Sequence, residues 1–157
     1  RRSKKASAAE TKLSHNVIEI FDARLNTTYD TQTCLYTTQA VIADVIIQAT
    51  ITTTLPTWRE RGSASQAEQA KWDGYLEQLK GFQAEHAKDT FVRLDQYRSS
   101  LLGLRGTGSG NKRESAMQMA ANQINAKYAE AKNTLFQNYN ADGKRRDANG
   151  GHTIRPY

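Results

Sequence analysis

The most regular hydrophobic pattern in the first third of the chain runs from about Val41 to Leu55, where apolar and polar side chains alternate. Alternate positions of a strand lie on one face, so this pattern predicts a β-strand with one apolar and one mostly polar face. The predicted apolar face carries Val45, Ile47, Ala49, Ile51, Thr53 and Leu55. Pro56 ends the strand because proline has no backbone N–H to donate. Two earlier segments, 17–21 and 27–39, are rich in β-branched and aromatic residues and predict further strands.

After residue 64 the apolar spacing changes to threes and fours, which predicts two long helices at about 65–103 and 112–139. Ser65 and Glu68 have the spacing of a capping box at the start of the first helix. The apolar stripe of the first helix comprises Trp72, Tyr75, Leu79, Phe82, His86, Leu94, Tyr97 and Leu101. The stripe of the second comprises Met117, Ala120, Ile124, Tyr128, Ala131, Leu135 and Tyr139. The glycine-rich stretch 104–111 between them predicts a loop, and it lacks the spacing of a phosphate-binding loop.

Strands followed by a helical hairpin indicate the α+β class. We expect an antiparallel sheet of N-terminal strands packed against a long C-terminal helical hairpin. The predicted domain covers residues 14–140, with strands to about residue 56. A flexible basic segment at 1–13 and a coil tail at 141–157 are expected to flank it.

Composition limits the classes of function. Lys and Arg number 22 and Asp and Glu 16, which gives a net charge of +6. Much of the excess lies near the two ends, in 1–5 and 144–146, so one hypothesis is a basic adaptor that binds anionic partners through its tails. Nucleic-acid binding is disfavoured because most Tyr and Trp residues lie on predicted core stripes and the basic clusters lack aromatic residues. No apolar run approaches the ~20 residues of a membrane span, and the chain shows no signal segment. The single Cys34 allows no intrachain disulfide, and we expect it to be a small buried residue.

The candidate chemistry lies in the first helix, in the segment Phe82-Gln83-Ala84-Glu85-His86. In the zinc-protease motif H-E-x-x-H, two His one helical turn apart bind Zn²⁺ and the Glu is the general base. Here Phe82 replaces the first His, Gln83 replaces the Glu, and His86 remains. Gln83 cannot take the proton of a metal-bound water. We therefore expect no catalytic residue in this segment, and Phe82, Gln83, Glu85 and His86 form a degenerate motif.

His86 itself allows two interpretations. A single His on an apolar helix face is usually a core or boundary residue. Alternatively, a relocated zinc site could use His86, His152 and a carboxylate such as Glu85. Glu85 points about 100° away from His86 around the helix, so these two neighbours do not naturally chelate one ion. His15 lies near the start of the chain. We expect no cofactor, and zinc only if the relocated site exists.

Several motifs occur together in the order of a known family. Cys34 precedes a long strand that ends in Leu55-Pro56-Thr57-Trp58, a second Trp follows at Trp72, and the degenerate motif comes about ten residues later. A helix rich in Ala and Asn then ends near Tyr139-Asn140, and Gly151-His152 is similar to the Gly-His element near the end of many members. Over roughly residues 29–139, the chain thus resembles a bacterial family of predicted secreted zinc-dependent proteases, a family that is largely uncharacterised and whose domain has no established function.

The departures from that family fall on the chemistry, at Phe82 and Gln83. Members often carry a second Cys near the start of the last helix, where this chain has Glu114-Ser115-Ala116. The resemblance implies that the scaffold is shared, that the activity is lost and that the location is extracytoplasmic, either periplasmic or secreted. Three hypotheses follow. The first is a non-catalytic pseudoenzyme that binds another protein, the second is a metal-dependent hydrolase with a relocated site, and the third is the basic adaptor.

Overall fold

The structure is a computed structural model, and it describes residues 10–13 and 17–151. These residues divide into two compact units. The described part of unit 1 comprises residues 10–13, 49–92 and 139–151, and unit 2 comprises residues 17–48 and 93–138. Two long helices, α1 (Gln66–Leu101) and α2 (Arg113–Arg146), contribute residues to both units. Each unit is therefore assembled from segments that are distant in sequence.

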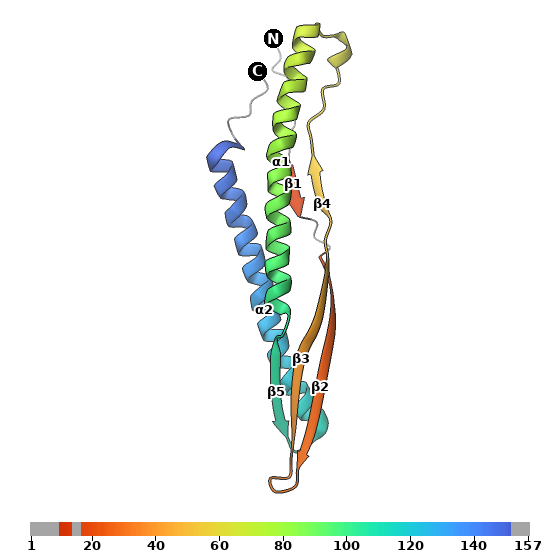
Figure 1. Ribbon diagram of the computed structural model, residues 1–157, viewed down its shortest axis with the longest axis vertical. Helices are drawn as coiled ribbons and strands as arrows, with labels where there is room; N and C mark the ends of the chain where they lie inside the picture. The colour runs from red at the N-terminus through yellow and green to blue at the C-terminus, as the bar shows by residue number, and fades with distance from the viewer. Residues whose placement is uncertain (1–9, 14–16, 152–157) are drawn as a thin grey trace. The chain divides into compact units, whose positions relative to one another are not determined.

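Unit 2 is built on a three-stranded antiparallel sheet in the order β2-β3-β5 (Figure 1). The strands are β2 (Ile18–Asp30), β3 (Leu35–Gln48) and β5 (Arg105–Gly110). In the ladder, Asp22 faces Asp44 and Ala23 faces Ile42, so Ala43 is an extra residue on β3 and forms a bulge. The bulge shifts the alternation of buried positions along β3. Thr38, Ala40 and Ile42 are buried before it, and Val45 is buried after it.

β5 corrects the prediction of a glycine-rich loop at 104–111. Its glycines do not form a flexible loop. They allow α2 to approach the sheet closely. A Cβ atom added to Gly106 would collide with the backbone of Ala120, and one added to Gly108 would collide with the backbone of Ala116. Ala116 and Ala120 are themselves fully buried. Small residues on both sides thus permit a strand and a helix to pack with little space between them.

The core of unit 2 also takes residues from both predicted stripes. Leu94, Tyr97 and Leu101 of α1 and Leu135 of α2 are buried. The antiparallel sheet with long helices after the strands confirms the predicted α+β class. The helix start is confirmed as well: the Ser65 N–H and hydroxyl donate to the Glu68 carboxylate at 2.9 and 2.8 Å, and the Glu68 N–H donates to the Ser65 hydroxyl at 3.3 Å.

Unit 1 contains a separate two-stranded sheet, in which β1 (Glu10–Leu13) pairs antiparallel with β4 (Ile51–Thr54). The single strand predicted for 41–55 is therefore wrong. The chain leaves the β-structure at Ala49-Thr50, and the two pieces pair with different strands. The alternating pattern continues through this break and gave no signal of it. Residues 10–13 were expected to be flexible and instead form β1.

An aromatic cluster in unit 1 explains the spacing of the two Trp residues. The Trp58 ring lies 5.7 Å from the Trp72 ring, and Trp72 lies 5.3 Å from Tyr75. Pro56 is buried, and the connection after it contains the short 3₁₀-helix η1 (Arg61–Ser63). Arg61 donates two hydrogen bonds to the Asp73 carboxylate of α1, at 3.2 and 2.7 Å. The Leu-Pro-x-Trp element thus fixes the connection to the first turns of α1.

Two further expectations differ from the structure. Coil was predicted from residue 141, but α2 continues through Arg146 and a π-helical turn, η2, follows at Asp147–Gly151. Basic residues at 144–146 favour this extension because they lie at the negative end of the helix dipole. Cys34 is exposed, not buried, and has a φ of 57° in the turn between β2 and β3. Among the described helices, none is long and apolar enough to cross a membrane.

Candidate functional site

The degenerate motif lies on the part of α1 that belongs to unit 1. The Phe82 and His86 rings are one turn apart and meet edge to face, with their centroids 4.8 Å apart. Phe82 is half-buried, whereas its neighbour Gln83 is buried at 4% exposure. Gln83 is therefore the more buried of the two side chains. Glu85 is exposed, as its position around the helix predicts.

His86 lies near an ion pair between Asp89 of α1 and Arg146 of α2. Partial burial lowers the pKa of the His86 imidazole, and the positive charge of Arg146 lowers it further. Asp147 and Asp89 act in the opposite direction and raise this pKa, but more weakly. Both leading causes disfavour the charged form of His86, so the imidazole is neutral at pH 7.

The residues around His86 do not fit a zinc site. Phe82 has no lone pair to offer, and the guanidinium of Arg146 would repel a bound cation. Within residues 10–13 and 17–151, no three His, Cys, Asp or Glu side chains form a group that could hold a metal ion. His152 and His15 lie outside the described residues, so the relocated site with His86 and His152 stays a prediction.

A surface cavity of about 400 Å³ opens beside this ion pair, lined by Phe82, Asp89, Arg145, Arg146 and Asn149. Arg145 donates a hydrogen bond to the Asp142 carboxylate at 2.9 Å. Two of the three basic residues at 144–146 are thus engaged by acidic residues of unit 1. The segment 1–5 lies outside the described residues, so the adaptor hypothesis stays a prediction.

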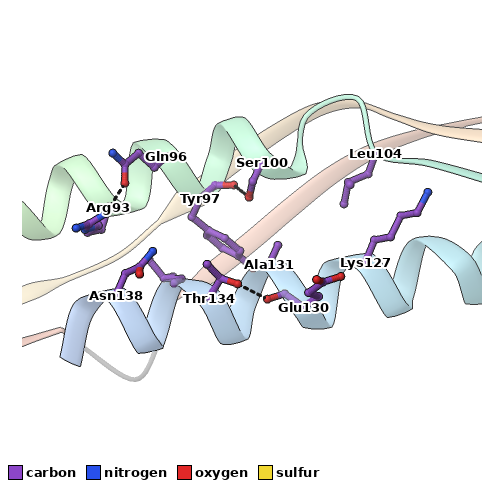
Figure 2. A pocket seen from close by; sticks show the side chains of 11 residues that line it. Arg93, Gln96, Tyr97, Ser100, Leu104, Lys127, Glu130, Ala131, Thr134 and Asn138 are labelled. Atoms are coloured by element: carbon purple, nitrogen blue, oxygen red, sulfur yellow. Dashed lines mark hydrogen bonds between the residues drawn. The ribbon is translucent and has the colours of Figure 1, made fainter. Parts of the chain in front are cut away.

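Unit 2 has a groove of its own between α1 and α2 (Figure 2). It has a volume of about 350 Å³. Leu104, Ala131 and Leu135 supply apolar surface, and polar side chains come from both helices: Arg93, Gln96, Ser100, Lys127, Glu130, Thr134 and Asn138. Arg93 donates a hydrogen bond to the Gln96 side chain at 2.9 Å, and the Lys127 ammonium donates to the Arg105 carbonyl at 2.6 Å. Apolar surface with polar groups beside it is typical of a binding groove.

Tyr97 lines this groove and also belongs to a polar network around Glu19 of β2. The Tyr97 and Tyr128 hydroxyls donate to the two carboxylate oxygens of Glu19, at 2.9 and 2.8 Å. The Lys132 ammonium lies 3.3 Å from the same carboxylate and donates to the Tyr128 hydroxyl at 3.0 Å. The Glu19 side chain is only 9% exposed. A largely buried carboxylate thus accepts hydrogen bonds from two hydroxyl groups and lies beside a positive charge.

This network changes the acidity of its members. Burial raises the pKa of the Tyr97 hydroxyl, and the hydrogen bond to Glu19 raises it further. The hydrogen bond to Tyr128 raises the pKa of Lys132, against the opposing effect of burial and with help from Glu19. Both groups therefore keep their protons at neutral pH, and their contacts with Glu19 join β2 to both helices.

Sequence reasoning placed Tyr97 and Tyr128 on core stripes but did not identify Glu19 or Lys132 as their partners. The strand pattern around Glu19 gives no sign of a polar contact. The contacts to Tyr97 and Tyr128 span 78 and 109 residues, so no local spacing reveals them. Arg146 was missed for a related reason, because a predicted coil tail cannot be placed beside α1.

Residues 3–143 match the family described as "Bacterial protein of unknown function (DUF922)". The match covers most of the chain, and the protein belongs to this bacterial family. The family description assigns no activity, so the zinc-protease resemblance and the degenerate motif stay predictions. No curated protein and no solved structure matches the chain.

Proposed function

We propose that this protein is a non-catalytic relative of zinc-dependent proteases, located outside the cytoplasm, that acts by binding another protein. The observation that carries the proposal is the chemistry around His86. Phe82 and Gln83 replace a ligand and a base, and the positive charge of Arg146 lies close enough to lower the pKa of the remaining His. A zinc hydrolase needs a metal ligand and a general base, and neither Phe82 nor Gln83 can supply one.

The groove of unit 2 is the surface that we propose contacts the partner. Its apolar surface would be buried by the partner, and the hydrogen-bonding side chains of both helices would select it. Ala131→Arg tests this assignment, because a long charged side chain would fill the groove while Ala131 is only half-buried. Binding to a purified candidate partner should be lost in this variant and kept in Lys80→Ala, a change on the exposed part of α1 in unit 1. Equal binding by both variants would reject the groove.

A zinc titration together with a peptidase assay tests the absence of catalysis. We expect no stoichiometric zinc and no hydrolysis. A known zinc protease is the positive control for both the titration and the assay. Stoichiometric zinc in the natural sequence, with hydrolysis lost in His86→Ala, would overturn the proposal.

The second candidate is the hydrolase with a relocated site at His86, His152 and a carboxylate. One observation favours it: the lowered pKa keeps His86 neutral, which is the form that binds metal. If purified protein exposed to zinc and then dialysed contains no metal, this candidate is rejected.

The proposed location rests on the resemblance to secreted proteases. Fractionation of the native bacterium, followed by detection of the protein with a specific antibody, tests it directly. We expect the protein in the periplasmic or culture fraction. Its recovery with cytoplasmic markers would contradict the proposal.

A further inference from the structure

The sheet of unit 2 has two edges of different character. β5 forms one edge, has only six residues and carries three glycines. β2 forms the other edge and has 13 residues. In the described part of the chain, β2 pairs with β3 along one side and with no strand along the other. A long edge strand presents a row of backbone N–H and C=O groups that another strand can pair with.

The side chains of β2 are suited to pairing. The bulge residue Ala43 lies on β3, so β2 keeps a regular alternation along its whole length. On the face that carries Glu19, Phe21 and Leu25 are 37% and 47% exposed. On the opposite face, Asp22 and Arg24 are both largely exposed. Asp22 and Arg24 lie 3.7 Å apart as an ion pair within the strand, and Ile18 and Ile20 on the same face are 52% and 49% exposed. Around Ala23, the strand therefore places two apolar residues symmetrically on one face and two opposite charges symmetrically on the other.

This arrangement is complementary to itself. If two copies of β2 pair antiparallel with Ala23 facing Ala23, Asp22 of each copy faces Arg24 of the other. On the other face, Phe21 of each copy faces Leu25 of the other. Opposite charges and apolar pairs directly across two strands both stabilise a ladder. The overlap extends over residues 18–28, which is most of β2.

Registers centred on either neighbour of Ala23 are worse. With Arg24 at the centre, two Arg24 side chains face each other, and with Asp22 at the centre two Asp22 carboxylates do so. Like charges directly opposite destabilise a ladder. With Thr27 at the centre, Arg24 faces Asp30, but only residues 24–30 overlap. The Asp30 carboxylate also accepts a hydrogen bond from the Gln32 N–H within the turn, at 2.8 Å.

We propose that two copies of this protein associate through their β2 strands, antiparallel and with Ala23 on the two-fold axis. The two three-stranded sheets then form one continuous sheet. The interface is isologous, so every contact occurs twice. This inference concerns self-association and goes beyond the proposed binding of another protein, because it uses the edge of the sheet and not the groove between the helices.

Sedimentation velocity over a concentration series tests the association. We expect a monomer–dimer equilibrium that weakens about tenfold or more in Asp22→Arg and in Arg24→Asp, since each change places like charges opposite at two positions. The combined variant Asp22→Arg/Arg24→Asp restores opposite charges and should restore the dimer. Circular dichroism confirms that the exposed substitutions leave the fold intact. A protein that stays monomeric up to about 1 mM, or a dimer insensitive to both single changes, would overturn the proposal.

Disulfide trapping tests the register. In a Cys34→Ser background, Ala23→Cys places two thiols across the two-fold axis, within the distance that a disulfide spans. Mild oxidation should link the copies of this variant. Asn26→Cys is the control because Asn26 is exposed like Ala23. It should not be linked, because Asn26 faces Ile20 of the second copy in the proposed register. Linkage of Asn26→Cys alone, or of both variants equally, would overturn the proposed register.

Discussion

At the scale of single residues, Cys34 has the least favourable backbone conformation. Among the described non-glycine residues it alone has a positive φ, 57°. Its thiol donates a long, weak hydrogen bond to the Thr31 carbonyl, at 3.8 Å. We predict that Cys34→Gly raises the free energy of unfolding by up to about 1 kcal/mol, because glycine adopts this conformation without a Cβ clash. Urea denaturation measures the change. Cys34→Ala keeps the Cβ atom and should show no gain, so equal stability of the two variants would contradict this explanation.

His86 gives a prediction for pH dependence. Its pKa is lowered in the folded protein by partial burial and by Arg146, so the unfolded chain binds the proton first as the pH falls. The stability linked to His86 is therefore present above about pH 6.5 and is lost below it. We predict that unfolding free energy falls less steeply between about pH 7.5 and 5 in His86→Gln than in the natural sequence. Chemical denaturation at several pH values measures both slopes. Parallel curves would show that His86 does not have the lowered pKa.

At the scale of secondary-structure elements, the contact between β5 and α2 depends on Gly106 and Gly108. We predict that Gly108→Ala lowers the free energy of unfolding by about 3 kcal/mol or more, because the new methyl group collides with backbone atoms that cannot move alone. Gly81→Ala is the control. It lies in α1 with open space around it, and should raise stability by up to about 1 kcal/mol. Thermal unfolding of both variants measures the difference, and a tolerated Gly108→Ala would contradict the close packing.

The elements also show what the sequence could reveal. The two helices and the capping box follow from local spacing, and the structure confirms them. The early segments 17–21 and 27–39 do contain strand, but β2 continues through residues 22–26 and a turn at 31–34 interrupts the second segment. β5 could not be predicted, because its glycines are strand residues only when α2 packs on them. The break between β3 and β4 at Ala49-Thr50 could not be predicted either. The strands on its two sides pair with different partners, but apolar and polar residues keep alternating through it. The last turns of α2 depend partly on the ion pair between Arg146 and Asp89, which no local pattern contains.

At the scale of the whole molecule, contacts between residues distant in sequence hold the strands and helices together. The motif at 82–86 was visible in the sequence, whereas the Glu19 network joins β2, α1 and α2 across large separations. The two units are each built from non-adjacent segments, so neither can be excised as one stretch of chain. Local changes in β2 should therefore have effects on the helices that a sequence motif would not indicate.

The Glu19 network gives the prediction that belongs to this scale. Glu19→Gln should lower the free energy of unfolding by about 1–3 kcal/mol, since a largely buried carboxylate loses charge-assisted hydrogen bonds. Tyr97→Phe removes one of those hydroxyls without emptying the core. In a double-mutant cycle measured by urea denaturation, we expect the two changes to be coupled by about 0.5–1.5 kcal/mol. Strictly additive effects would show that Tyr97 and Glu19 do not interact.

The exposed thiol of Cys34 has a practical consequence. It is the only cysteine of the chain and lies in the turn that joins β2 to β3, so a maleimide dye would label one defined position. If two copies pair through β2, their turns point in opposite directions, each about 24 Å along the strand from Ala23 to Asp30. Donor and acceptor dyes on the two copies would then be about 50 Å apart. This separation lies in the range that resonance energy transfer measures, so dyes on Cys34 would report the distance between the two copies without any added cysteine.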